Sequence, residues 1–326
     1  MSTWERPKQL LPLASPRALI EDTVEHARAL APDERIRILA GEHLAAPFRR
    51  VLPDLPASAY LVEPQARGTC PVLAWAAWEL ARLDPEAVLV SLHSDHLIRP
   101  LHAFQDTVVA AAEVARTLEM LVTVGIQPDR VETGYGHIQP GVDIDAPAGA
   151  DAFRVAAFHE KPDAETARRY VDAGYLWNSG IFVWKASVFL EEVRRHAPEV
   201  AAHLPLLEHE GPEAFFSAVP VCVVDTAVME RSDRVACVRA TFAWDDVGSW
   251  EALARTRDAD ASGNVIVGEG RAVEGNRNVI FAEGGRVVLF GVDDMVVVRS
   301  GDTTLVVPRK RAADLKTLLK SLDEIS

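Results

Sequence analysis

The stretch AVLVSLHSDHLI (87–98) joins a short apolar run to the polar residues that directly follow it. The run, AVLVSL, has the length and the Val and Leu content of a buried β-strand. Comparable runs occur through the first two thirds of the chain, at IRILA (36–40), AYLV (59–62), LVTVG (121–125) and FRVAAF (153–158). The pattern therefore predicts a sheet of several strands, with Asp95 at the carboxyl end of one of them.

Helical patterns lie between these strands, at 18–30, 71–83 and 103–118. The second of them has Thr69 as its expected N-cap and Pro71 in its first turn. Strands that alternate with helices predict an α/β fold whose sheet is mostly parallel. Because ligands of such sheets bind at the carboxyl ends of the strands, polar residues at those ends are the candidates for a functional site.

The pattern changes at Asn264, where short strands begin to alternate with Gly, Asp and Asn turns. This predicts a small antiparallel β-rich unit, followed by a closing helix over 309–325. The stretch 255–264 has the composition of a linker. We therefore expect one domain over residues 1–260 and a β-rich unit over residues 261–326.

The composition excludes several classes of function. The chain has 326 residues, a net charge of -14 and a pI near 5.2, which argues against nucleic acid or an anionic membrane as a partner. It remains compatible with a phosphorylated small molecule that a few local cations hold. No apolar run has the length of a membrane span, and the start lacks a signal-peptide pattern. The three cysteines have no metal-like spacing, which indicates reduced thiols in a cytoplasmic protein.

Two acidic segments predict a site for a divalent cation. Asp95 follows a strand in SDHLI, and Asp245 and Asp246 lie in AWDDVGSW at a tight turn into a helix. One acid of that pair could complete a magnesium site with Asp95, since Mg²⁺ prefers one or two carboxylates, water and substrate phosphates. The alternative is that these acids cap a turn and a helix. His93 and His96 also make zinc conceivable, although no further ligands stand nearby at metal spacing.

Two other segments carry groups that could bind a phosphorylated sugar. Glu160 and Lys161 in FHEKPD end a strand, where a hydroxyl acceptor and a phosphate-binding cation would be useful together. Asn178 in WNSG offers an amide beside a hydroxyl and a glycine. The alternative for this region is a surface salt bridge with an ordinary turn.

Two loops could approach a nucleotide. EPQARGTCP (63–71) enters a helix, and main-chain amides at a helix N-terminus can hold an anion or bind the edge of a base. GYGHI (134–138) is a glycine-flanked segment that could lie close to a base or a sugar.

Together these segments occur in one order: EPQARGTCP, SDHLI, ETGYGHI, FHEKPD, GYLWNSGIF, VMERSDRVA and WDDVGSW. In that order the sequence resembles the mannose-1-phosphate guanylyltransferases (GDP-mannose pyrophosphorylases), from about Arg6 to the expected closing helix. GYLWNSGIF and WDDVGSW are the most specific segments, whereas EKP and SDH are shared more widely by sugar-phosphate nucleotidyltransferases. The resemblance implies a Rossmann-like (GT-A-like) mixed sheet with helices on both faces, and a small β-rich C-terminal unit.

The resemblance also implies a reaction and its catalytic residues. A phosphate oxygen of mannose 1-phosphate would attack the α-phosphorus of GTP in line, which forms GDP-mannose and releases pyrophosphate. Asp95 and Asp246 would be ligands of Mg²⁺. Lys8 would face the β- and γ-phosphates, and Lys161 would meet the sugar phosphate.

Substrate-binding residues are implied in the same way. Glu160 and Asn178 would hold sugar hydroxyls, Gly136 would lie near the sugar or base, and Glu63 belongs to the loop expected near the nucleotide. The partners would be GTP and mannose 1-phosphate, with no nucleic acid and no membrane, and a homodimer is a reasonable expectation. Since no isomerase-like domain follows in this sequence, we expect a single activity.

The sequence departs from this family at its start. The family begins with a strand and a glycine-rich loop of the kind GGSGTRLWPLS, and residues 1–3 stand where the end of that loop is expected. The missing loop would supply amides and an arginine for the triphosphate. The alternatives are an enzyme whose first strand is absent from this sequence, a non-catalytic relative that binds nucleotide sugars, and an active chain in which another segment replaces the loop.

Smaller departures affect specificity. Gly68 replaces a usual asparagine, Cys70 a usual alanine, His93 a frequent proline and Thr226 a common tyrosine. A nucleotidyltransferase for another base or another hexose 1-phosphate therefore remains an alternative.

Overall fold

The structure is a computed structural model that describes residues 7–13 and 15–314. Contacts between Cα atoms divide the chain into two compact units. The larger unit consists of the segments 23–94 and 98–244, and the smaller unit of the segments 1–22, 95–97 and 245–326. The domain boundary at residue 260 that the sequence suggests stays a prediction.

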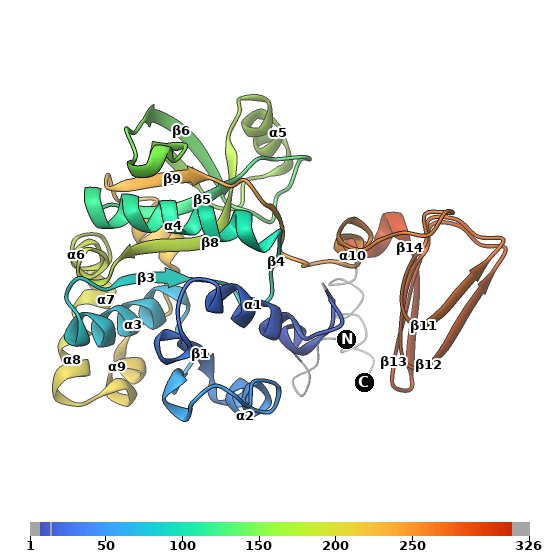
Figure 1. Ribbon diagram of the computed structural model, residues 1–326, viewed down its shortest axis with the longest axis horizontal. Helices are drawn as coiled ribbons and strands as arrows, with labels where there is room; N and C mark the ends of the chain where they lie inside the picture. The colour runs from blue at the N-terminus through green and yellow to red at the C-terminus, as the bar shows by residue number, and fades with distance from the viewer. Residues whose placement is uncertain (1–6, 14, 315–326) are drawn as a thin grey trace. The chain divides into compact units, whose positions relative to one another are not determined.

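A six-stranded sheet forms the centre of the larger unit (Figure 1). In the order of the sheet, its strands are β3 (Val88–Ser91), β8 (Leu176–Lys185), β5 (Leu121–Ile126), β9 (Val235–Arg239), β7 (Ala152–His159) and β6 (His137–Asp143). β5 and β9 pair in parallel, whereas β8 is antiparallel to β3, β5 and β6, and β7 is antiparallel to β6 and β9. The sheet is therefore mixed, as the resemblance implies.

The expectation of a mostly parallel sheet is wrong, and β8 is the main reason. β3 and β5 run in the same direction, but β8 lies between them and runs the opposite way. All residues of β8 are buried. Its sequence consequently lacks the alternation of polar and apolar residues that marks a half-buried strand.

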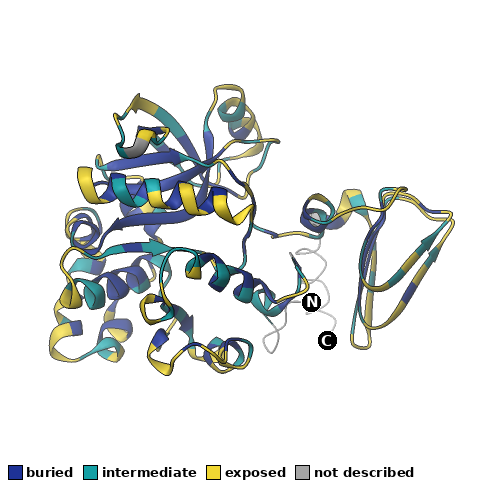
Figure 2. Cartoon of the chain, in the orientation of Figure 1, coloured by how far each residue is buried: buried dark blue, intermediate teal, exposed yellow. Residues whose placement is uncertain are grey.

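Helices cover both faces of this sheet, and each face has its own hydrophobic core. β5 is buried along its whole length, and its side chains alternate between the two faces. Leu121 packs in the cluster that contains α3 (Thr69–Leu83) and α6 (Ala186–His196), whereas Val122 packs with α4 (Leu101–Leu118). Figure 2 shows α4 with exposed residues on the side turned away from the sheet.

The three helices that the sequence predicts are present, as α1 (Leu19–Arg28), α3 and α4. The sequence patterns did not predict the other α-helices of the larger unit or its π-helix. These are α2 (Glu42–Val51), α5 (Ala164–Asp172), α7 (Pro198–Ala201), α8 (Leu204–His209), α9 (Pro212–Ala218) and the π-helix η5 (Asp225–Met229).

The predicted N-cap of α3 is wrong. Gly68 occupies that position with a φ of 83°, a left-handed conformation that favours glycine. A Cβ on Gly68 would lie 2.4 Å from the main-chain oxygen of Cys222. Thr69 lies inside the helix instead, and its hydroxyl accepts a hydrogen bond from the main-chain N–H of Val224 at 3.0 Å.

Two predicted strands form a small sheet of their own. β1 (Ile38–Gly41) and β2 (Tyr60–Glu63) pair in parallel. A second two-stranded sheet contains β4 (Leu97–Arg99) and β10 (Ala243–Asp245).

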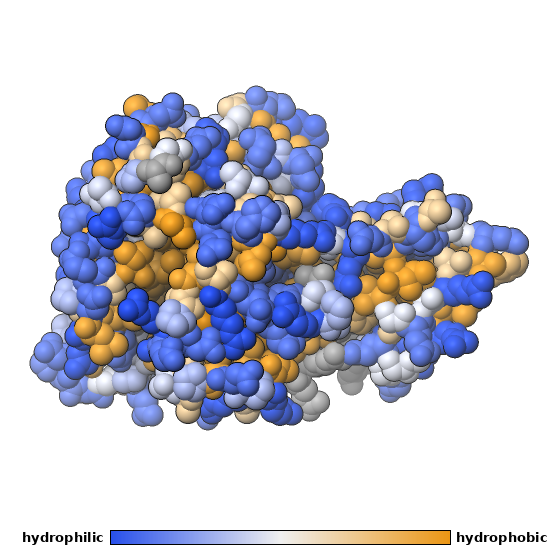
Figure 3. Space-filling model, viewed as in Figure 1, coloured by the Kyte–Doolittle hydropathy of each residue, from blue (hydrophilic) through white to orange (hydrophobic). Residues whose placement is uncertain are grey.

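The smaller unit contains a four-stranded sheet of C-terminal strands. These are, in sheet order, β11 (Val265–Val273), β12 (Val279–Phe290), β13 (Met295–Ser300) and β14 (Thr303–Pro308). The expectation of an antiparallel unit is wrong, because β11, β12 and β13 pair in parallel and only β13 and β14, among these described strands, pair in antiparallel. Figure 3 shows apolar surface over these strands, where Val288, Phe290 and Val306 are exposed.

Two buried asparagines explain the parallel stacking. Asn264 precedes β11 and Asn278 precedes β12, so that they occupy equivalent positions in successive turns of the chain. The Asn264 Oδ1 accepts hydrogen bonds from the main-chain N–H and the Nδ2 of Asn278, at 2.9 and 3.0 Å. The Asn278 Oδ1 accepts in turn from the main-chain N–H of Met295 at 3.0 Å. The side chains thus link the starts of the three parallel strands.

The end of the described chain is a short 3₁₀-helix, η6 (Arg309–Asp314). The rest of the closing helix predicted over 309–325 lies outside the described residues. The predicted linker at 255–264 begins inside α10 (Trp250–Thr256). Across the described residues, no helix combines the length and the hydropathy that a membrane crossing requires.

Candidate active site

Three predicted site residues meet in the smaller unit. The ammonium of Lys8, in the 3₁₀-helix η1 (Lys8–Leu10), donates to Asp95 Oδ2 at 2.9 Å and also to the main-chain oxygen of Asp246. The side chains of Lys8 and Asp95 are only 24% and 21% exposed, so water screens their attraction less than at an open surface. One cation therefore joins the two segments that were predicted to supply the metal ligands.

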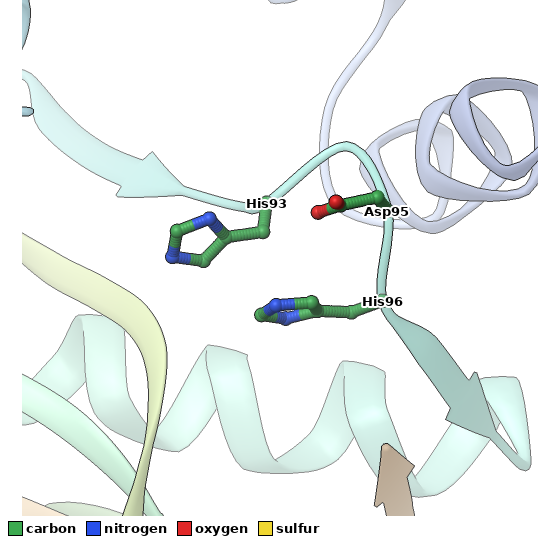
Figure 4. A group of neighbouring side chains, drawn as sticks. All are labelled: His93, Asp95 and His96. Carbon is green, nitrogen blue, oxygen red and sulfur yellow. The ribbon is translucent and has the colours of Figure 1, made fainter. Parts of the chain in front are cut away.

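Asp95 lies in the turn that leads from β3 to β4, as Figure 4 shows. Within this turn the side chains of His93, Asp95 and His96 each offer one metal-ligand atom, and these atoms lie within 4.8 Å of one another. The carboxylate is the donor that Mg²⁺ prefers, whereas the imidazoles suit zinc and other transition metals. Both metal interpretations of this turn therefore remain predictions.

The two adjacent acids of AWDDVGSW have different surroundings. Asp245 is buried, accepts from the main-chain N–H of Val247 at 2.8 Å, and pairs with Arg255 at 2.8 Å. Asp246 is half-buried, and its carboxylate accepts from the main-chain N–H of Gly248 at 2.9 Å. The arginine pair gives Asp245 a structural role, which leaves Asp246 as the acid of the two that fits a metal site.

The helix-cap interpretation of these acids is wrong. Ser249 is the N-cap of α10, and its hydroxyl accepts from the main-chain N–H of Ala252 at 3.2 Å. The tight turn before it is real, because Val247 has a φ of 48°. The main-chain N–H groups that donate to the carboxylates of Asp245 and Asp246 are those of Val247 and Gly248, inside that turn.

Three other predicted residues meet in the larger unit. The main-chain N–H of Asn178 donates to the main-chain oxygen of Gly136 at 2.8 Å. A Cβ on Gly136 would lie 2.8 Å from Glu160 Oε2 and 3.3 Å from the Cβ of Asn178. A larger residue at this position would therefore displace the Glu160 carboxylate, whereas glycine leaves room for it.

Asn178 is held in one orientation by its neighbours. Its Oδ1 accepts from the hydroxyl of Thr123 at 2.7 Å and from the main-chain N–H of Gly180 at 3.2 Å. Its Nδ2 donates to Asp225 Oδ1 at 3.0 Å. A side chain fixed on both of its ends can present its amide to a ligand with little loss of conformational entropy.

Asp225 is a residue of this cluster that the sequence analysis missed. Burial, and then repulsion from Glu160, raise its pKa to about 6. Glu230 also belongs to the cluster, since its carboxylate accepts from the main-chain N–H of Glu160 at 3.0 Å. In the sequence, the signal for this residue is the first acid of VVDTAVME (223–230), directly before Thr226. Nothing in the spacing indicates that a π-helix starting at Asp225 turns this acid toward Asn178.

Lys161 forms an ion pair with Glu160 and is 62% exposed. Its φ of 45° places it at a sharp turn directly after β7. The surface salt bridge considered from the sequence is thus present in the structure. Because the ammonium is exposed beside the Gly136–Glu160–Asn178 cluster, a role in phosphate binding stays a prediction for Lys161.

Glu63 ends β2, and burial raises the pKa of its carboxyl group. No hydrogen bond or ion pair within the described part of the chain joins it to Glu160 or Asn178. The loop that follows it is anchored to the segment before η5, since the Arg67 guanidinium donates to the main-chain oxygen of Phe216 at 2.7 Å and the Arg67 main-chain oxygen accepts from the N–H of Cys222 at 2.9 Å. The structure therefore does not bring Glu63 to the other predicted substrate-binding residues, and its role stays a prediction.

A further group of metal-ligand side chains, Glu192, His196 and Asp233, lies on and beside the end of α6. Glu192 is buried and accepts from the hydroxyl of Ser232 at 2.6 Å, and it pairs with His196 at 3.2 Å and with Arg234 at 3.5 Å. The hydroxyl of Ser232, the guanidinium of Arg234 and the imidazole of His196 already surround this carboxylate. The group therefore fits an ion-pair network that fastens α6 to the segment before β9.

Comparison with known proteins defines the class of this molecule. Residues 3–263 match the nucleotidyl transferase family model, and the chain belongs to that family. Residues 268–322 match the model of the mannose-phosphate isomerase/GMP-like β-helix domain. The parallel stacking of β11, β12 and β13 agrees with a β-helix.

Within the family, the similar proteins include an alginate biosynthesis protein and mannose-1-phosphate guanylyltransferases. The alginate biosynthesis protein AlgA of Pseudomonas aeruginosa is 34% identical over 99% of this chain and 69% of its own length. A mannose-1-phosphate guanylyltransferase of Escherichia coli K12 is 34% identical over 97% of this chain and 69% of its own length. The chain is thus a relative of the mannose-1-phosphate guanylyltransferases inside the nucleotidyl transferase family.

A solved structure resembles the whole described fold. It comes from Thermus thermophilus and is described as a mannose-1-phosphate geranyltransferase. It is 33% identical, has a TM-score of 0.87, and covers 98% of this chain and 93% of its own. The α/β nucleotidyltransferase fold with a β-rich C-terminal unit is thereby confirmed.

Proposed function

We propose that this chain is a mannose-1-phosphate guanylyltransferase, which converts GTP and mannose 1-phosphate to GDP-mannose and pyrophosphate with the help of Mg²⁺. One observation carries the proposal. The ammonium of Lys8 donates both to the carboxylate of Asp95 and to the main-chain oxygen of Asp246, two residues that are distant in the sequence. Near-full-length similarity to a guanylyltransferase supports the same substrates. The reduced thiols and acidic charge support a cytoplasmic setting.

The residues present fit a magnesium ion. Carboxylate oxygens are the hard donors that Mg²⁺ prefers, and one or two of them suffice when substrate phosphates complete the coordination. Asp95 and Asp246 would hold the ion, which would supply charge neutralisation on the phosphates of GTP. The contact with Lys8 keeps Asp95 close to the Asp246 segment without a metal ion.

The protein side chains would position the two substrates. Lys161 is exposed beside Glu160, so that its ammonium can meet the phosphate of mannose 1-phosphate. Glu160 and Asn178 lie next to Gly136 and can bind sugar hydroxyls. Side chains of this kind would restrict the orientation of the sugar phosphate, and orientation supplies a large part of the rate enhancement in phosphoryl transfer.

The test is pyrophosphate release by the 326-residue chain with mannose 1-phosphate, Mg²⁺ and each of GTP, UTP, dTTP and ATP. We expect turnover with GTP and a loss of roughly 100-fold or more in kcat for Asp95→Asn and for Asp246→Asn, because each change removes a charged ligand that acts on the phosphates. Asp258→Asn is the matched control, since Asp258 is an exposed acid of the same unit. It should leave turnover unchanged.

Three outcomes would contradict parts of the proposal. Full activity in both site variants would show that the metal-ligand assignment is wrong. Turnover with another nucleotide in place of GTP would show that the assignment of guanine as the base is wrong. If the chain binds GDP-mannose and releases no pyrophosphate, the non-catalytic alternative is correct.

The homodimer expected from the resemblance is checked by light scattering of the same sample.

A further inference from the structure

Two cysteines that are distant in the sequence meet next to the segment that carries Asp225. Cys70 lies in the first turn of α3, and Cys222 lies three residues before η5. The main-chain N–H of Cys70 donates to the main-chain oxygen of Cys222, and the Cys222 thiol also lies 3.9 Å from the carboxylate of Glu199. The third cysteine, Cys237, lies apart from them in the fully buried strand segment of β9.

The main chain holds the two cysteines at a separation that suits a disulfide. The N–H of Cys70 donates to the main-chain oxygen of Cys222 at 3.1 Å, and the N–H of Cys222 donates to the main-chain oxygen of Arg67 at 2.9 Å. A direct main-chain hydrogen bond makes Cys70 and Cys222 close neighbours, as the partners of a disulfide have to be. Disulfides typically join Cα atoms that are about 4.4–6.8 Å apart.

The two thiols differ in exposure and in acidity. Cys70 is fully buried, whereas Cys222 keeps 9% of its surface exposed between the exposed residues Val221 and Val223. The neighbouring Cys70 thiol lowers the pKa of the Cys222 thiol, whereas Cys222 and burial raise the pKa of Cys70. Because the thiolate is the reactive form, we expect Cys222 to be the thiol that reacts first with a small oxidant.

We propose that Cys70 and Cys222 form an oxidation site, which a hydroperoxide converts to an intramolecular disulfide. With hydrogen peroxide, the Cys222 thiolate attacks one oxygen, the O–O bond breaks, and hydroxide leaves with a sulfenic acid formed on Cys222. The sulfur of Cys70 then attacks that of Cys222, the S–O bond breaks, and water leaves with the proton of Cys70. In sum, two thiols lose two electrons and two protons, and one peroxide is reduced to two waters.

The disulfide would act on the cluster around Asn178. Bonded sulfurs lie about 2.05 Å apart, which is shorter than any non-bonded contact between two thiols, so the two side chains and the segment that carries Cys222 would have to adjust. Cys70 is fully buried in a helix, whereas Cys222 lies between the exposed residues Val221 and Val223, so we expect the adjustment on the Cys222 side. Since Asp225 accepts from Asn178 Nδ2, we expect oxidation to disturb the orientation of Asn178. This consequence for the sugar site rests on the proposed function.

The experiment treats the reduced 326-residue chain with hydrogen peroxide, denatures it, alkylates its free thiols and weighs it. Three alkylated thiols are expected before oxidation and one afterwards, with Cys237 as the internal control. A non-reducing digest should contain one peptide pair that links Cys70 to Cys222, and dithiothreitol should restore all three thiols. The KM for mannose 1-phosphate should rise by roughly tenfold in the oxidised form, as for a lost hydrogen bond to a charged group, with the KM for GTP unchanged.

The matched variant is Cys70→Ala, in which Cys222 has no partner thiol. It should form no intramolecular disulfide and show no oxidation effect that dithiothreitol reverses. Three alkylated thiols after oxidation of the unchanged chain, a link that includes Cys237, or a link between two chains would overturn the oxidation site. A disulfide without any change in KM would overturn the coupling to Asp225. If neither form turns over substrate, the proposed function fails, while the thiol count still decides the oxidation site.

Discussion

At the scale of single residues, Asp225 shows how the fold changes the acidity of a carboxyl group. Burial and the neighbouring Glu160 raise its pKa from 3.8 to about 6. A carboxyl whose pKa is higher in the folded state than in the unfolded state binds its proton more tightly when folded. The free energy of unfolding therefore falls as pH rises from about 4 to about 6. Above pH 6 the ionised carboxylate destabilises the folded state by its full amount.

We expect Asp225→Asn to remove this pH dependence. The neutral amide carries no charge to desolvate, so the variant should be more stable than the parent above pH 6 by up to about 3 kcal/mol, at 1.36 kcal/mol for each unit of pKa. Below pH 4 the two proteins should have equal stability. Urea denaturation at pH 4 and at pH 7.5 measures the difference.

Asp163→Asn is the control for this experiment. Asp163 is an exposed N-cap whose pKa is lowered, first by the main-chain N–H of Thr166. Its ionised form is favoured in the folded state, so the sign is opposite: its contribution is present above pH 4 and is lost as pH falls through the lowered pKa. If Asp225→Asn changed stability equally at both pH values, the cause assigned to its raised pKa would be wrong.

Gly136 offers a second test at this scale. Gly136→Ala would place a Cβ 2.8 Å from Glu160 Oε2, which forces that carboxylate to move. We expect the KM for mannose 1-phosphate to rise roughly tenfold or more, as for the loss of a hydrogen bond to a charged group, while the KM for GTP changes little. Steady-state kinetics with each substrate varied in turn would measure this.

The control lies two residues away. A Cβ on Gly134 would have its nearest neighbour, Glu132 Oε1, at 3.4 Å, which is an ordinary contact. Gly134→Ala should therefore leave both KM values unchanged. Equal effects of the two substitutions would show that the close approach at Gly136 does not position Glu160 for the substrate.

At the scale of elements, the asparagine ladder decides how the C-terminal strands stack. Asn278→Ala would leave the main-chain N–H of Met295 and the main-chain oxygen of Val292 without their side-chain partner. Asn278 is completely buried, so water cannot replace the lost bonds. We expect a loss of about 2–4 kcal/mol in the free energy of unfolding, measured by denaturation followed by circular dichroism.

Asn276→Ala is the comparison, because Asn276 is exposed and bonds to Asp293 at the surface. A substitution of this kind changes stability by about 0.5 kcal/mol or less. Similar losses in the two variants would mean that the buried ladder contributes no more than a surface bond.

The direction of strands is where sequence patterns were least informative. Apolar runs located β3, β5 and β7, because a buried strand needs only its composition to be recognised. Pairing direction depends on which distant segment inserts between neighbours, and β8 inserts antiparallel between β3 and β5. In the C-terminal unit, hydrogen bonds between the side chains of Asn264 and Asn278 link the starts of parallel strands. The Gly, Asp and Asn residues of the turns do not by themselves indicate this parallel direction.

At the scale of the whole molecule, the sequence predicted the fold class because segments shared with a known family recur in a fixed order along the chain. It also named Lys8, Asp95 and Asp246, which meet in one unit, and Gly136, Glu160 and Asn178, which meet in the other. Asp225 could not be predicted, since its role comes from a π-helix. The proximity of Cys70 and Cys222 depends in the same way on tertiary structure.

The reversal of direction at β14 limits how this protein can evolve. The first two parallel turns of the chain each start from a buried asparagine, so duplicating one of them would lengthen the stack by a whole turn. β14 pairs in antiparallel with β13 and covers its outer edge. Gene duplication can therefore add turns ahead of β13, whereas the strand that closes the stack has to stay last.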